Sequence, residues 1–280
     1  MVQVALVHGI VREEERLLLN ALTQHPVIAP RLVHESDQAQ ITPDNTDCVL
    51  IRSVSHHHAR TIAFMLERRG LLVVNPSQTI ELCGDKIRTA IALEQGGVPQ
   101  PRFRTAFSVD EALRRMDEVG YPLVLKPPVG SWGRLLAKVN DRDAAEALLE
   151  HKQVLGGPQH HVYFLQEYIP QAGHDIRVFI AGGTPLAAIE RHADHWINNT
   201  ARGATVANRP LDEGLRNLAI AASAAVGGGL LAIDVLVSNG EYLVNEVNDR
   251  MEFKNSIAPT GVDLPQRVAE YLVQHVGVFV

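Results

Sequence analysis

The sequence predicts an α/β domain followed by a larger region that mixes helices with antiparallel strands. Two observations support this fold class. The first third alternates short apolar runs with amphipathic segments of helical spacing, which is typical of a small parallel sheet. The second half pairs apolar runs across glycine-containing turns, which is typical of antiparallel hairpins.

The composition is that of an ordinary folded chain. The 280 residues are 46% hydrophobic and 21% charged, enough for about two domains with a shared core. Lysine and arginine number 26 against 32 acidic residues, and this negative balance disfavours nucleic acid as a partner. No apolar run approaches the roughly 20 residues of a membrane span. The only cysteines, Cys48 and Cys83, lack metal-site spacing. We therefore expect a cytoplasmic protein that contacts no membrane.

The first domain is predicted to contain three strands and two helices in alternation. The strands are expected over residues 2–7, 48–51 and 71–74, and the helices over residues 12–22 and 59–69. Gly70 is placed as a helix stop, and Asn75-Pro76-Ser77 is a turn that opens a short helix. We place the end of this domain at residue 84.

Capping residues and turns divide the rest of the chain. Asp85 precedes one helix, and Ser108 with Glu111 forms a capping box that opens another, which ends at Gly120. Further helices are expected over residues 141–152, 212–226 and 264–273, and strands over residues 123–126, 135–139, 162–169, 176–180, 185–191, 231–237 and 242–247. We divide this part into a central unit, residues 85–168, and a C-terminal unit, residues 169–280.

Two lysines lie on rigid elements beside a glycine-containing loop. Lys86 is in the first turn of its helix, and Lys126 ends a strand directly before the loop Gly130-Ser131-Trp132-Gly133. Free backbone N–H groups and fixed ammonium groups are what a polyphosphate requires. Either lysine alone is better explained as a solvated surface charge, but their pairing with the loop favours a phosphate site.

Three oxygen-bearing side chains, Asp234, Glu246 and Asn248, interrupt two consecutive apolar strands. Such ligands suit a magnesium ion that bridges nucleotide phosphates. They share one face of the sheet if the hairpin has the three-residue loop Ser238-Asn239-Gly240, whereas a two-residue turn places Asp234 on the opposite face. We therefore predict the longer loop, with its glycine in the left-handed conformation. A solvent-facing polar strip is the weaker alternative, because acidic groups in such apolar runs usually have partners.

A strand end and a charged strand pair are candidates for nucleotide contacts. Gln166 and Glu167, with Ile169 beyond them, can present backbone groups and a side-chain oxygen to a base and a ribose, although an ordinary strand end is equally consistent. Asp175-Ile-Arg177 places two charges on one face, and Arg191 ends the next strand. These charges favour nucleotide or carboxylate contacts, with a surface ion pair as the alternative.

A polar, turn-like segment from Asn199 to Gly203 is rich in hydrogen-bond donors. Its Arg202 is suited to stabilise a negatively charged intermediate, and a solvated loop arginine explains it equally well.

In this order, these residues resemble the ATP-grasp superfamily over nearly the whole chain. Within it they are most similar to the RimK-type amino-acid ligases. The motif Met251-Glu-Phe-Lys-Asn-Ser256 with Thr260-Gly261 favours the ligases of lysine biosynthesis over the ribosomal-protein glutamate ligases. The segments that carry the resemblance are Cys83-Gly-Asp-Lys86, Val124-Leu-Lys126-Pro127, Gly130-Ser-Trp-Gly-Arg134, Gln166-Glu-Tyr168, Asp175-Ile-Arg177, His195-Trp-Ile-Asn-Asn-Thr-Ala-Arg-Gly203 and Asn245-Glu-Val-Asn248.

The resemblance implies an ATP-grasp fold behind a small pre-ATP-grasp domain, with ATP and two Mg²⁺ ions as cofactors. It implies a ligase that joins the side-chain carboxyl of the C-terminal Glu of a small acidic amino-group carrier protein to the α-amino group of 2-aminoadipate. The reaction would pass through an acyl phosphate. Related ligases assemble as dimers or tetramers, so a homo-oligomer is expected.

The resemblance also implies a role for each candidate residue. Arg202 and Lys126 are the implied catalytic residues, and the metal ligands are Asp234, Glu246 and Asn248. ATP would be held by Lys86, Lys126, Gly130, Ser131, Trp132, Gly133, Gln166, Glu167, Ile169, Asp175 and Arg177. The amino-acid pocket would be formed by Arg191, Asn199, Arg202, Asn255, Ser256 and Thr260.

One feature of the chain departs from the family pattern. Asp249-Arg250 follows Asn248 directly, where a neutral or imidazole residue is expected, and this charge pair can alter substrate preference. Glutamate ligation to the same carrier in arginine biosynthesis, or glutamate ligation to a protein tail, remains an alternative. A catalytically silent nucleotide-binding module is the alternative from another functional class.

Overall fold

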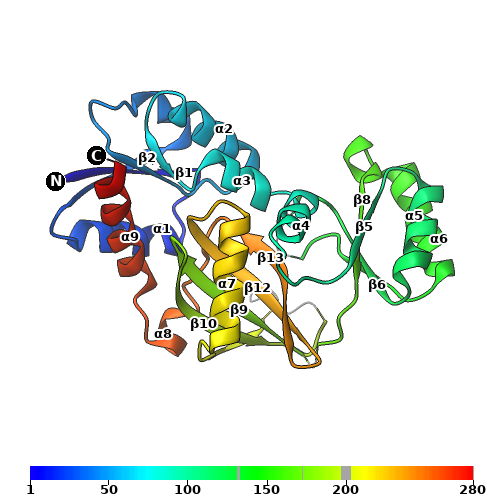
Figure 1. Cartoon of the computed structure of the whole chain (residues 1–280). Coiled ribbons are helices and arrows are strands. Elements are labelled where there is room, and N and C mark those ends of the chain that lie inside the picture. Colours follow the sequence, from blue (N-terminus) through cyan, green and yellow to red (C-terminus); the bar gives the residue numbers. More distant parts are fainter. Residues whose placement is uncertain (131–132, 172, 197–202, 280) are drawn as a thin grey trace.

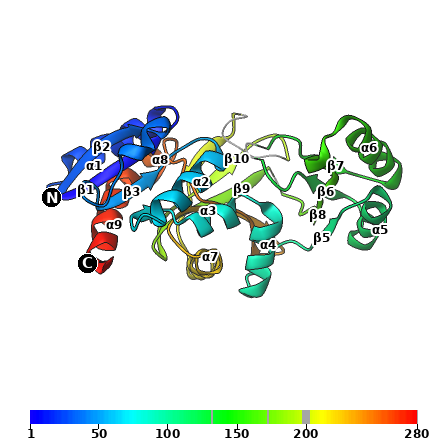
Figure 2. The same ribbon diagram turned by 90° about the horizontal axis from the view of Figure 1, so that it is seen from above.

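The computed structural model describes residues 1–130, 133–171, 173–196 and 203–279. These residues form three sheets that follow one another along the molecule (Figure 1). A four-stranded sheet lies at one end, a five-stranded sheet in the middle and a second four-stranded sheet at the other end, as Figure 2 shows from above.

The first sheet has the strand order β2-β1-β3-β4, and all its pairs are parallel. Its elements are β1 (Val2–His8), α1 (Glu13–Gln24), β2 (Ile28–His34), a 3₁₀ helix (Glu35–Gln40), β3 (Cys48–Ile51), α2 (His56–Glu67), β4 (Leu72–Val74) and α3 (Ser77–Cys83). The predicted parallel layer is confirmed. Strand β2 was not predicted, because Pro30 and Arg31 interrupt its apolar pattern, and proline is tolerated there since β2 is an edge strand.

Aspartate caps begin three of the helices that the sequence predicts. Asp85 accepts hydrogen bonds from the backbone N–H groups of Ile87 and Arg88, Asp141 accepts one from Ala144, and Asp212 accepts one from Leu215. A carboxylate at this position satisfies N–H groups that have no partner within the helix. The local sequence therefore determines where α4 (Lys86–Gln95), α6 (Arg142–Leu155) and α7 (Glu213–Ala225) start.

The sheet at the far end is antiparallel, in the order β5-β8-β6-β7. Helices α5 and α6 pack on one of its faces through Met116 and Leu149, which are fully buried against Leu123 and Leu165. Its remaining elements are β5 (Phe103–Ala106), α5 (Val109–Val119), β6 (Leu123–Lys126), β7 (Ala137–Val139), a 3₁₀ helix (Pro158–His161) and β8 (Tyr163–Glu167). The predicted pairing of the strands on either side of the glycine loop is confirmed by β6 and β7.

The central sheet has the order β11-β10-β9-β12-β13 and differs between its two faces. Its elements are β9 (His174–Ala181), β10 (Thr184–His192), β11 (Thr205–Asn208), β12 (Leu230–Ser238) and β13 (Glu241–Asn248), followed by α8 (Ile257–Thr260) and α9 (Leu264–Phe279). Along β9, Ile176 and Val178 pack under α7. On the opposite face, Phe179 joins the core shared with the first sheet and α9, whereas Asp175 and Arg177 line a cavity.

The hairpin between β12 and β13 corrects one prediction. Ser238 pairs with Glu241, so the loop is the two-residue turn Asn239-Gly240 and the predicted three-residue loop is wrong. Both turn residues have positive φ, 51° and 84°, which suits the right-handed twist of the strands and confirms the predicted conformation of Gly240.

A β-bulge nevertheless brings the three oxygen-bearing residues onto one face. The register shifts so that Val235 pairs with Val244 but Asp234 pairs with Glu246, which leaves Asn245 as the extra residue. The predicted shared face is therefore confirmed, although a bulge produces it and the loop length does not.

The C-terminal helix α9 returns to the first sheet and packs beside α1, and in Figure 1 the two ends of the chain lie close together. The predicted divisions after residues 84 and 168 remain predictions, and each falls between two of the sheets. Among the described residues, no helix combines the length and the apolar character that crossing a bilayer requires.

Candidate functional site

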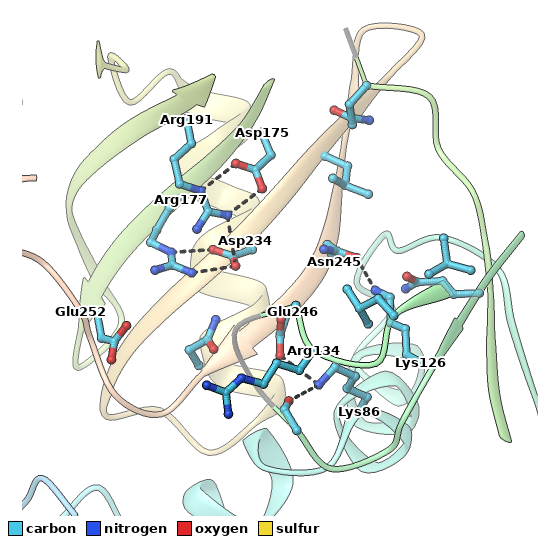
Figure 3. Close-up of a pocket in the computed structure, with 18 of the residues that line it drawn as sticks. Lys86, Lys126, Arg134, Asp175, Arg177, Arg191, Asp234, Asn245, Glu246 and Glu252 are labelled. Atoms are coloured by element: carbon cyan, nitrogen blue, oxygen red, sulfur yellow. Dashed lines mark hydrogen bonds and ion pairs between the residues drawn. The ribbon is translucent and has the colours of Figure 1, made fainter. Parts of the chain in front are cut away.

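A cavity of about 640 Å³ lies between the sheets. Figure 3 shows charged side chains from several strands and from the start of α4 pointing into it. Fourteen of the predicted site residues line it: Lys86, Lys126, Gly130, Gly133, Gln166, Glu167, Ile169, Asp175, Arg177, Arg191, Asp234, Glu246, Asn248 and Asn255. The fold thus gathers most of the predicted residues at one place.

The two predicted lysines approach the cavity from different elements. The Nζ of Lys86 donates to the carbonyl of Gly130 at 2.6 Å and lies 3.3 Å from Oε1 of Glu246. Lys126 is buried, and its Nζ donates to Oδ1 of Asn245 at 2.9 Å (Figure 3). Burial lowers the pKa of Lys126 to about 8, so the side chain still carries its charge near neutral pH. Within the described part of the chain, its hydrogen bond is to a neutral amide, which suits a site that receives an anion.

The three predicted metal ligands line the cavity together. Asp234 and Glu246 are direct partners across the two strands, and Asn248 lies two residues further on the same face. The Nδ2 of Asn248 donates to the carbonyl of Ala232 at 3.4 Å, which leaves its Oδ1 as an acceptor. Carboxylate and amide oxygens on rigid strands fit a hard cation such as Mg²⁺.

Two arginines hold the acidic residues at the floor of the cavity. Arg177 donates to both oxygens of Asp234 at 2.7 and 2.8 Å, and Arg191 donates to both oxygens of Asp175 at 2.7 and 2.6 Å. Arg191 also lies 3.2 Å from Oδ2 of Asp234. Burial acts to raise the pKa of Asp234, but the two guanidinium groups outweigh it and lower this pKa to about 2. Burial raises the pKa of Asp175.

This network already pairs the charges of two predicted site residues, Arg191 and Asp234, within the protein. Arg191 is only 3% exposed and forms ion pairs with two carboxylates, so its charge is neutralised within the protein. Asp234 keeps its carboxylate in the cavity, yet its oxygens already accept three guanidinium contacts. Glu246 and Asn248 therefore have more free oxygen lone pairs than Asp234.

The predicted adenine and ribose end lies at the strand β8. Gln166 is buried, and Glu167 forms an ion pair with Arg102 at 3.0 Å. Ile169 adds an apolar side chain next to them, and all three line the cavity. The combination of an apolar side chain and backbone groups at a strand end is compatible with a flat base.

Six predicted residues are not placed at the cavity by the structure. Ser131, Trp132, Asn199 and Arg202 lie outside the described residues. Ser256 is buried without lining the cavity, and Thr260 donates its hydroxyl to the carbonyl of Ser256. The roles of these residues remain predictions.

The cavity also has charged residues that the sequence analysis did not assign. They are Arg12, Glu14, Arg134, Arg250, Glu252 and Lys254. Asn245, which binds Lys126, was also missed as a site residue. No local sequence signal marks it, because the bulge is evident only once Val244 and Val247, three residues apart, are both seen to pack under α7.

Family models account for nearly the whole chain. Residues 83–272 match the RimK-like ATP-grasp domain, and residues 4–82 match the LysX preATP-grasp domain. ATP-grasp ligases use ATP and Mg²⁺ and form ADP and phosphate.

Similar proteins carry two related names. A glutamate–LysW ligase ArgX from Sulfurisphaera tokodaii is 34% identical over 278 residues, which cover 98% of this chain and 99% of that protein. An alpha-aminoadipate–LysW ligase LysX from Saccharolobus solfataricus is 36% identical over 219 residues, which cover 77% of this chain and 80% of that protein.

A solved structure supports the same relationship. The RimK domain protein ATP-grasp from Sphaerobacter thermophilus superimposes with a TM-score of 0.77 at 25% identity, and the match covers 97% of this chain and 100% of that one. The two lysines, the glycine loop and the strand pair with the oxygen-bearing residues all lie within the residues that match the family model. The chain belongs to the RimK-like ATP-grasp family of ligases.

Proposed function

We propose that this protein joins the side-chain carboxyl of the C-terminal Glu of a small acidic carrier protein to the α-amino group of 2-aminoadipate, with ATP as the energy source. The main support is one arrangement: Lys86 and Lys126 enter the same cavity as Glu246 and Asn248. This arrangement offers cations for phosphates opposite oxygen ligands for metal ions. The LysW ligase names of the relatives support the carrier as the partner.

In this proposal the two lysines bind the ATP phosphates. Lys86 is already oriented by the carbonyl of Gly130, and Lys126 by Asn245. A phosphate oxygen that replaces these contacts forms charge-assisted hydrogen bonds in a partly desolvated site. Gln166, Glu167 and Ile169 hold the adenosine end.

Two Mg²⁺ ions are proposed, with Asp234, Glu246 and Asn248 as ligands. The donor set fits Mg²⁺, because it offers two carboxylates and one amide oxygen on a shared sheet face. Bound Mg²⁺ neutralises charge on the phosphoryl group during its transfer. Glu246, now 3.3 Å from Lys86, is positioned to exchange that ion pair for a metal bond when the nucleotide enters.

The proposed chemistry has two steps. A carboxylate oxygen of the carrier attacks the γ-phosphorus, the bond to the β-phosphate oxygen breaks, and an acyl phosphate and ADP form. The α-amine then attacks the acyl carbon, phosphate departs, and the nitrogen loses a proton. Phosphorylation is needed because a carboxylate has no leaving group. Arg202 is proposed to stabilise the acyl phosphate and the tetrahedral intermediate that follows it.

Glutamate is a second candidate for the amino acid. The ArgX relative matches 98% of this chain, whereas the LysX relative matches 77% at nearly the same identity. The motif from Met251 to Ser256 favours a carrier-protein ligase over a ribosomal-protein glutamate ligase, and both of these amino acids are consistent with it.

A single set of assays tests the proposal. The protein is mixed with ATP, Mg²⁺ and either amino acid, with and without a carrier that ends in Glu, and both phosphate release and carrier mass are measured. We expect phosphate release and a carrier heavier by one aminoadipyl group only in the complete mixture. A glutamyl adduct instead assigns the second candidate. Turnover of glutamate without carrier, or no turnover at all, refutes the proposal.

The assembly state belongs to the same proposal. We expect a dimer or tetramer, which light scattering coupled to size-exclusion chromatography measures directly.

A further inference from the structure

One wall of the cavity is built by the first domain and faces the segment that follows β13. Arg12, Glu14 and Val54 line the cavity from the first domain. Opposite them, Nη1 of Arg250 donates to the carbonyl of Val54 at 2.6 Å, and Nη1 of Arg12 donates to Oε1 of Glu252 at 2.8 Å. The first domain and the segment after β13 are thus in direct contact here. The residues assigned to ATP and to metal ions do not include any in this part of the cavity.

Glu14 is an acidic residue that lines the cavity and is largely buried as a whole. It lies in the first turn of α1 and is only 4% exposed. Within the described part of the chain it forms no hydrogen bond or ion pair, whereas its neighbours are paired: Glu13 with Lys254 at 3.5 Å, and Glu15 with Arg52 at 3.1 Å. Its oxygens are not enclosed, so they are accessible from the cavity and keep their lone pairs for a ligand that donates hydrogen bonds.

Arg250 presents a donor edge to the same wall. Its Nη1 donates to the carbonyls of Ser53 and Val54, which fixes the orientation of the guanidinium group. Its Nε is 3.8 Å from the carboxylate of Asp249, beyond hydrogen-bonding distance, and within the described residues its Nη2 has no hydrogen-bond partner. On this edge Nη2 is available and Nε is held only by the long ion pair with Asp249. It is the same edge with which Arg177 and Arg191 bind carboxylates in this protein.

The other cations of this wall are less available. Arg12 donates through Nε and Nη2 to Glu15 at 3.1 and 3.0 Å and through Nη1 to Glu252. Lys254 is 43% exposed and is paired with Glu13. Arg250 is thus the cation at this wall that keeps a bidentate edge for a ligand.

From this geometry we propose that Glu14 and Arg250 form the binding site for the amino-acid substrate, with its amino group on Glu14 and one of its carboxylates on Arg250. The inference rests on the proposed function and assigns residues that the family resemblance did not. Arg250 is two residues beyond Asn248, at most about 7 Å along the chain, and both line the cavity, so an amino acid held there lies beside the phosphate and metal part of the cavity. The departure at Asp249-Arg250 thereby acquires a role in substrate choice.

Two substitutions test the site by steady-state kinetics. We expect Glu14→Gln and Arg250→Gln each to raise the KM of the amino acid about 10- to 150-fold, the effect of losing one hydrogen bond to a charged group, without changing the KM of ATP. Glu13→Gln is the matched control on the same helical turn and should leave both constants unchanged. Arg250→Lys should restore part of the affinity, and melting temperatures check that each variant folds.

Trapping with hydroxylamine separates amino-acid binding from carrier binding, because this small nucleophile reacts with an acyl phosphate without using the amino-acid site. We expect both variants to form carrier hydroxamate at the wild-type rate from carrier, ATP and Mg²⁺. A parallel loss of hydroxamate with a raised KM for the carrier shows that these residues bind the carboxylate of the carrier, and it overturns the inference. Unchanged KM values for the amino acid overturn it as well.

Failure of the proposed function has a different signature. If the wild type forms no hydroxamate, the ligase reaction is refuted, and calorimetric titration with 2-aminoadipate and with glutamate tests the site alone. Binding to the wild type that is weakened in both variants supports the site. Equal binding to wild type and variants, or none to the wild type, refutes it.

Discussion

Replacement of Lys126 by methionine should make the protein more stable while it abolishes ATP turnover. Lys126 is 7% exposed, and burial lowers its pKa from 10.5 to about 8. The difference of 2.5 units, at about 1.36 kcal/mol per unit, corresponds to about 3 kcal/mol of instability in the charged form. Loss of the hydrogen bond to Asn245 costs about 1 kcal/mol, so we expect a net gain of about 2 kcal/mol at pH 7.

The pH dependence of this gain has a definite sign. Between pH 8 and 10.5 the unfolded chain binds a proton at this lysine that the folded chain has released, so wild-type stability rises with pH there. The advantage of Lys126→Met should therefore be complete below about pH 8 and should shrink as the pH approaches 10.5.

Urea unfolding followed by circular dichroism at pH 7, 9 and 10 measures both effects. Lys254→Met, at a position that is 43% exposed, is the control and should change the free energy of unfolding by less than about 0.5 kcal/mol. A Lys126→Met variant less stable than the wild type at pH 7, or a gain independent of pH, refutes the reasoning.

Three further predictions concern the strand pair and its turn. Glu246→Gln should lower kcat on the order of 10³-fold, and a near-normal rate contradicts its metal role. Its melting temperature should change little, because the Glu246 side chain is partly exposed. Asp234→Asn should lower the free energy of unfolding by roughly 3–5 kcal/mol, because the guanidinium groups of Arg177 and Arg191 lose a charged partner. It should also remove the wild-type loss of stability as the pH falls from 3.8 through about 2, which acid unfolding titrations measure. Gly240→Ala should destabilise by roughly 1–2 kcal/mol because φ is 84°, whereas Gly277→Ala in α9 should stabilise slightly, and thermal melts that rank them otherwise contradict the turn assignment.

The sequence by itself determined most of the helices and strands and most of the candidate site residues, although the strands β2, β5 and β11 were not predicted. Helix starts at Asp85, Asp141 and Asp212 depend on hydrogen bonds between residues two or three apart, so a short stretch of sequence is sufficient to locate them. Polar residues embedded in apolar strands, such as Asp234, are conspicuous for the same local reason. These signals led to the predicted phosphate-binding lysines and the predicted metal ligands.

Tertiary structure alone decided the register and the pairing of charges. The bulge at Asn245 is set by packing of Val244 and Val247 under α7, and it aligns Glu246 with Asp234 despite the short turn. The contact between Arg250 and Val54 joins residues 196 positions apart. Contacts of this kind depend on how separately formed layers pack together, and that information is distributed over the whole chain, so no local pattern in the sequence reports it.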